Sequence, residues 1–152
     1  MPLAHGLQDS SAVAAVAANL SILLEDLQRD EGLSLYPYTD TVGKVTIGFG
    51  RNLTDNGIST EEASQLLKND MTNVVDEMRV RFMGMELSEG VERGLLNMAY
   101  NMGVPRLKKF KKMWVALHDG HYATAAEEAL DSRWAKQVGA RAQRVAALIR
   151  EG

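Results

Sequence analysis

The sequence predicts a mostly helical α+β protein. Apolar residues recur at three- and four-residue steps in several stretches, beginning with residues 10–31, which is the spacing of one helix face. Residues 38–50 break that spacing and carry Thr, Val, Ile and Phe around glycines, which is typical of a β-hairpin. The 152 residues, 45% of them apolar, are enough for a hydrophobic core and fit a single domain.

The first predicted helix covers residues 10–31 and follows a loose arm over residues 1–9. Val13, Leu20 and Leu27 mark its apolar face. No charged residue occurs between Ser10 and Leu24, so a membrane segment or signal peptide is the alternative. That stretch is shorter than the roughly 20 apolar residues that span a bilayer, and no Lys or Arg precedes it. We therefore favour a soluble amphipathic helix.

The candidate catalytic groups follow at the end of this helix. Gly32 can adopt positive φ and end the helix, which places Glu31 at its C-terminus. A carboxylate is disfavoured at that negative end of the helix dipole, which suits a general acid. Val42-Gly43-Lys44 predicts the hairpin turn, with Asp40 near the end of one strand and Thr46 on the next. Paired carboxyl groups in different environments are what acetal hydrolysis requires.

Helices account for most of the remaining sequence. Residues 52–57 are turn formers, and Ser59 with Glu62 forms a capping box for a long helix to about Arg81. A further helix starts at Ser88, and its residues Val91, Leu95 and Met98 are expected to face inward. The other helices run from Pro105 to about Leu117, from Ala123 to Leu130 and from Ala140 onward. Trp134 is expected to close the core. The eight methionines predict gap-filling in a helical core. We expect one domain made of a small lobe (10–58), a linking helix (59–81) and a helical lobe (82–152).

Composition excludes some chemistry and divides the charge. The chain has no Cys, so disulfides and thiol chemistry are absent. His118 and His121 have no third ligand at suitable spacing, and we expect neither a metal nor a cofactor. Residues 1–100 carry a net charge of −8 and residues 101–152 of +5, within a total of −3. The densest basic run, from Arg106 to Lys112, is either a solvated helix face or a site that attracts anionic polymers.

The catalytic stretch resembles the phage lysozyme (endolysin) family of muramidases, glycoside hydrolase family 24. Three motifs occur in order and without insertion: Glu31-Gly32-Leu33, Tyr38-x-Asp40-Thr41-x-Gly43 and Thr46-Ile47-Gly48-Phe49-Gly50. The segments 97–103, 132–134 and 140–145 are also similar to family segments, so the resemblance covers roughly residues 20–150. It implies a lysozyme-like fold in which a small β-hairpin lobe and a larger helical lobe are joined by a long helix.

The resemblance also implies roles for single residues. Glu31 would be the general acid, while Asp40 and Thr46 would position the attacking water. Gly50, Tyr100 and Asn101 would contact the substrate. In the family, the first arginine of the last helix pairs with the catalytic glutamate, and that role falls to Arg141. Arg51 departs from the pattern, because many relatives have His there.

We therefore expect an endolysin that hydrolyses the β-1,4 bond between N-acetylmuramic acid and N-acetylglucosamine of bacterial peptidoglycan. An inverting course requires carboxyl groups roughly 6.5 to 9.5 Å apart, and a retaining course about 5 Å. The expected protein is a monomer without a nucleic-acid partner, made in the host cytoplasm and acting on the cell wall. An N-terminal signal-anchor, which some relatives have, is not favoured here. The alternatives are a non-catalytic glycan- or surface-binding module, a membrane-disrupting basic segment and a lytic transglycosylase.

Overall fold

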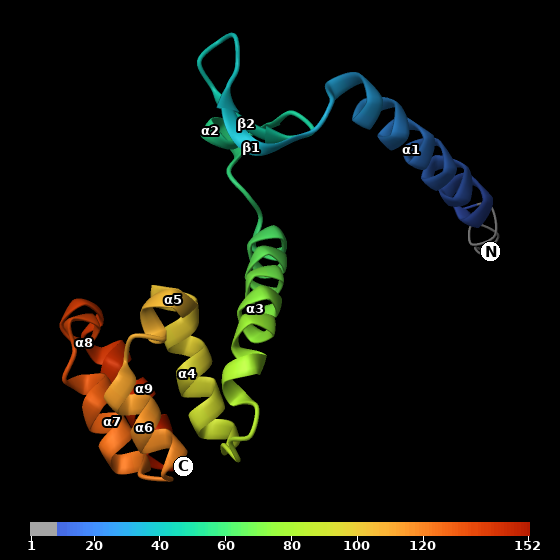
Figure 1. Cartoon of the computed structure of the whole chain (residues 1–152). Coiled ribbons are helices and arrows are strands. Elements are labelled where there is room, and N and C mark those ends of the chain that lie inside the picture. Colours follow the sequence, from blue (N-terminus) through green and yellow to red (C-terminus); the bar gives the residue numbers. More distant parts are fainter. Residues whose placement is uncertain (1–8) are drawn as a thin grey trace, which may run out of the picture. The chain divides into compact units, whose positions relative to one another are not determined.

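The computed structural model describes residues 9–152, and Figure 1 shows their helices and strands. The chain divides into two units, residues 1–60 and residues 61–152. All of the long helix after its first residue belongs to the second unit, and the predicted division into lobes stays a prediction. Most of the described chain is helical and one small antiparallel sheet is present, so the predicted mostly helical α+β class is confirmed.

The first unit combines one long helix with the sheet. Its elements are α1 (Asp9–Glu31), β1 (Ser34–Thr39), β2 (Val45–Gly48), β3 (Arg51–Asn52) and α2 (Leu53–Asn56). The strands are antiparallel in the order β1-β2-β3, and Tyr38 pairs with Thr46, which pairs in turn with Asn52. The predicted hairpin is therefore present, and residues 52–56, described from the sequence only as turn formers, end a third strand and form a one-turn helix. Asn52 ends a third strand and also caps a one-turn helix by accepting a hydrogen bond from the Asp55 amide.

Helix α1 ends at Glu31, as its sequence predicts. Its apolar residues remain exposed, from 42% at Leu27 to 66% at Val16, so unit 1 itself does not cover the apolar face. Among the helices of residues 9–152, none combines the length and hydropathy that a membrane crossing requires. The predicted loose arm lies outside the described residues except for Asp9, which begins α1.

The second unit is a bundle of helices. They are α3 (Thr60–Phe82, of which Thr60 precedes the boundary), α4 (Glu89–Met102), α5 (Val104–Leu107), α6 (Lys111–His118), α7 (Tyr122–Leu130), α8 (Arg133–Val138) and α9 (Ala140–Arg150). Ser88 caps α4 by accepting a hydrogen bond from the Val91 amide, as predicted. The single helix predicted from Pro105 was wrong. Residues 108–110 separate α5 from α6, and the Phe110 amide there bonds back to the Leu107 carbonyl.

The core of this unit gathers around α4. Its inward face is fully buried at the predicted positions Val91, Leu95 and Met98. Helix α9 packs against α4 and α7 (Figure 1). Helices α4 and α9 approach closely at Gly94, where an added Cβ would lie only 3.0 Å from Cγ1 of Ile149. Trp134 is 2% exposed, so its predicted place in the core is confirmed.

Candidate active site

Glu31 lies at the junction of α1 and the sheet. Gly32 ends the helix with φ of +70°, and its amide still bonds to the Gln28 carbonyl at 3.2 Å. The exposed side chain of Glu31 lies against Gly50, which follows β2. A Cβ built on Gly50 would lie 3.1 Å from Oε2 of Glu31, and Gly50 has φ of +81°. Position 50 therefore favours glycine for two reasons, its backbone conformation and the carboxyl group beside it.

Asp40 is fixed by the turn that it begins. Its Oδ1 accepts hydrogen bonds from the amides of Val42 (3.0 Å) and Lys44 (2.8 Å). Its own amide donates to the Lys44 carbonyl at 2.8 Å, and its carbonyl accepts from the Gly43 amide. The side chain is half-buried, and within residues 9–152 no donor bonds to its second oxygen, Oδ2. One carboxylate oxygen thus sets the orientation, and the other can accept a hydrogen bond from a bound molecule.

Thr46 adjoins the same turn. It is 4% exposed, and its hydroxyl donates to the Lys44 carbonyl at 3.3 Å. The hydroxyl oxygen can therefore only accept a further hydrogen bond. Lys44 contacts both candidate groups through its backbone, since its amide bonds to Asp40 and its carbonyl accepts from Asp40 and Thr46.

The two carboxyl groups lie near opposite ends of the strand β2. The turn carrying Asp40 precedes this strand, and Gly50, which contacts Glu31, follows it. At roughly 3.3 Å per residue, the four residues of β2 extend about 10 Å. Glu31 and Asp40 are thus held at opposite ends of one short strand of unit 1.

Two residues of this unit had not been singled out from the sequence. Thr54 accepts a hydrogen bond from the Val45 amide at 2.9 Å, and Asp55 pairs with the Lys44 ammonium at 2.9 Å. Asp55 also bonds to Asn52, whose amide group donates to Oδ2 at 2.8 Å. The spacing Asn52-x-x-Asp55 is that of a helix N-cap followed by an acidic N3 residue, and this signal could have identified α2.

The other predicted site residues lie in unit 2. Tyr100, 41% exposed, and Asn101 line a depression of about 440 Å³ together with Asp70, Asn73 and Val74. Asn101 has a structural contact as well, because its Oδ1 accepts a hydrogen bond from the indole of buried Trp134 at 2.8 Å. The Nε of Arg141 donates to Asn97 at 2.8 Å. The predicted pairing of Arg141 with Glu31 stays a prediction, as do the sugar contacts.

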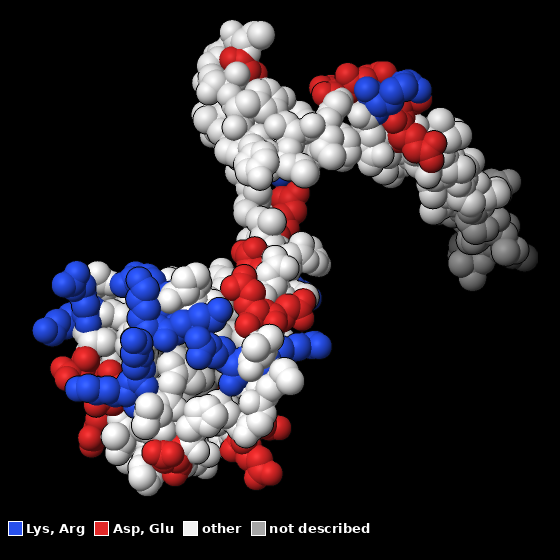
Figure 2. Space-filling view, in the orientation of Figure 1, with Lys and Arg blue, Asp and Glu red and all other residues white. Residues whose placement is uncertain are grey.

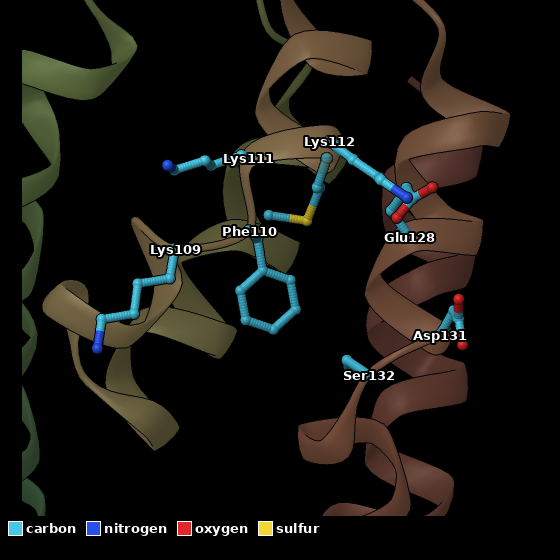
Figure 3. Close-up of a pocket in the computed structure, with 8 residues that line it drawn as sticks. Lys109, Phe110, Lys111, Lys112, Glu128, Asp131 and Ser132 are labelled. Carbon is cyan, nitrogen blue, oxygen red and sulfur yellow. The ribbon is translucent and has the colours of Figure 1, made fainter.

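The basic run lines a pocket of about 420 Å³ in unit 2. Lys109, Lys111 and Lys112 border it, and Figure 3 shows the half-buried Phe110 pointing into it. Glu128 and Asp131 lie on the opposite wall. Within residues 9–152 none of the three lysines forms an ion pair, and Figure 2 shows Lys and Arg side chains gathered across this face of the unit.

The chain is similar to known proteins along most of its length. Residues 28–151 match the family described as phage lysozyme. The pre-baseplate central spike protein Gp5 of Enterobacteria phage T4 is 31% identical over 86% of this chain, which spans only 28% of that protein. Two probable T4-type lysozymes of Dictyostelium discoideum are 26% and 24% identical over 88% of this chain and 96% of their own length.

The matched range includes the three predicted motifs and almost all of unit 2. The predicted lysozyme-like fold, mostly helical with a small antiparallel sheet, is therefore confirmed. The chain belongs to the phage lysozyme family.

Proposed function

We propose that this protein is a glycoside hydrolase, a lysozyme that cleaves the β-1,4 bond between N-acetylmuramic acid and N-acetylglucosamine of bacterial peptidoglycan. Family membership supports the class of reaction. The observation that carries the proposal is the placement of Glu31 and Asp40 at the two ends of β2. The carboxyl group of Glu31 lies against Gly50, and backbone amides of the turn fix the carboxylate of Asp40.

In the proposed reaction Glu31 donates its proton to the glycosidic oxygen as the bond to the anomeric carbon breaks. Water forms the new bond to that carbon from the other face of the sugar and transfers a proton to Asp40. The anchoring of Oδ1 supports this role, because it directs Oδ2 without occupying it. Thr46 would accept a hydrogen bond from the same water, since its own proton is donated to Lys44.

The biological setting is part of the proposal. An enzyme of this kind would be made in the cytoplasm of a host bacterium and would reach the wall at lysis, acting as a monomer. Gly50, Tyr100 and Asn101 would contact the glycan. The exposure of Tyr100 and the depression beside Asn101 support the last two.

Glu31→Gln tests the acid, and Glu25→Gln is its matched control, because Glu25 is an exposed glutamate on the same helix. On purified peptidoglycan, we expect Glu31→Gln to release reducing ends at least about 100-fold more slowly than the wild type, the range of acid catalysis. Glu25→Gln should match the wild type. Wild-type activity in Glu31→Gln would refute the mechanism.

Product analysis separates the remaining alternatives. Hydrolysis leaves reducing N-acetylmuramic acid, whereas a lytic transglycosylase leaves an anhydro-sugar. The anomer formed first, followed by NMR, distinguishes inversion from retention. A non-catalytic binding module would bind the wall without releasing any sugar end.

We further propose that the pocket bordered by the basic run binds anionic polymers of the cell surface. Lys109, Lys111 and Lys112 line one pocket and form no ion pair within residues 9–152, which supports this binding. Replacing all three by Gln should weaken pelleting with wall preparations and reduce its salt dependence. Lys68→Gln, at an exposed position of α3, is the control. Binding that is unchanged in the triple variant would refute this role.

A further inference from the structure

The turn that carries Asp40 is held from outside by the one-turn helix α2. Lys44 is the residue whose backbone contacts both Asp40 and Thr46. Any movement of the Lys44 peptide would therefore move the carboxylate and the hydroxyl together.

Two contacts from α2 hold that peptide, and a third joins α2 to its cap. The hydroxyl of Thr54 accepts a hydrogen bond from the Val45 amide, directly after Lys44. Asp55 holds the Lys44 ammonium at 2.9 Å and, through its other oxygen, the side-chain amide of Asn52 at 2.8 Å. Asn52 is also the sheet partner of Thr46, so the chain of contacts closes on β2.

We propose that Thr54 and Asp55 are positioning residues for catalysis. They hold Lys44 and Val45 so that the amides at the turn direct the Asp40 carboxylate and the Lys44 carbonyl directs the Thr46 hydroxyl. This role rests on the proposed hydrolase function. The ion pair by itself contributes little to global stability, because its side chains are 38% and 50% exposed. It acts on the geometry of the turn, and a misplacement of about 1 Å in a catalytic group can cost about 100-fold in rate.

Thr54→Val removes the acceptor while keeping the shape of the side chain, and Thr54→Ser keeps the acceptor. We expect Thr54→Val to lower kcat about 10-fold with little change in KM, and Thr54→Ser to retain most of the wild-type kcat. Thr72→Val is the matched control. Thr72 also uses its hydroxyl on a backbone group, donating to the Lys68 carbonyl on α3, outside the proposed site.

A second readout does not depend on activity. The Lys44 amide donates to Asp40, so its NMR shift should move and its hydrogen exchange should accelerate in Thr54→Val and in Asp55→Asn.

The effects of Lys44→Met and Asp55→Asn on kcat should not add, since each breaks the same ion pair.

The outcomes separate this inference from the proposed function. A wild type that releases no sugar ends refutes the hydrolase, and the Lys44 amide still reports on the contacts. An active wild type refutes the positioning role if Thr54→Val keeps both its kcat and its Lys44 amide shift. Should Thr54→Val fail to fold, Asp55→Asn decides by the same two measurements.

Discussion

Replacing Gly50 by alanine tests whether the Glu31 carboxyl group depends on the space beside this glycine for its position. The new Cβ would lie 3.1 Å from Oε2 and 3.5 Å from Cδ, whereas ordinary contacts begin at 3.4 Å. The carboxyl group must therefore move by about 0.3 Å or change rotamer. The φ of +81° adds about 1–2 kcal/mol of backbone strain for an L-residue.

Gly48→Ala provides the matched control in the same sheet. Gly48 has φ of +67°, so alanine there carries a similar strain, but a Cβ would meet nothing within 4 Å. Both variants should lose about 1–2 kcal/mol of unfolding free energy, or about 3–6 °C in Tm, measured by circular dichroism. Only Gly50→Ala should also lose activity per folded molecule.

We expect the kcat of Gly50→Ala for release of reducing ends to fall about 10-fold or more, since a shift of 1 Å in a catalytic group can cost about 100-fold. The folded fraction is measured in the same samples, so that instability is not counted as lost catalysis. A wild-type kcat in Gly50→Ala, or an equal fall in Gly48→Ala, would contradict the claim that Gly50 sets the position of the Glu31 carboxyl group.

Two further substitutions test contacts within unit 2. Asn101→Ala leaves the buried indole N–H of Trp134 without its acceptor and should cost about 1–3 kcal/mol in thermal unfolding, whereas Asn101→Asp keeps an acceptor and should cost less. A Tm of Asn101→Ala equal to the wild type would show that this bond does not stabilise the core. Gly94→Ala places a Cβ 3.0 Å from Ile149, so overpacking of about 1–3 kcal/mol should outweigh the roughly 1 kcal/mol gain in helix propensity. The denaturant midpoint should fall; a midpoint above the wild type would show that α9 can move away.

Local sequence chemistry was enough for the elements that carry the candidate site. Gly32 ends α1 at Glu31, and Gly43 forms the turn that follows Asp40, because both conformations depend on a residue that accepts positive φ. The 3.6-residue periodicity of α4 correctly predicted its buried face. Such features depend on neighbours along the chain, which a sequence displays directly.

Contacts between distant residues were decided only by the tertiary structure. Asn101 accepts a hydrogen bond from an indole 33 positions away, Glu31 lies against Gly50, and Asp55 pairs with Lys44 across 11 positions. No local pattern encodes these pairs, since each depends on how separate elements pack. The sequence by itself determined which residues are candidates for the chemistry and on which elements they lie. The tertiary structure decided which neighbours orient them, because hydrogen bonds and steric contacts act through space and not along the chain.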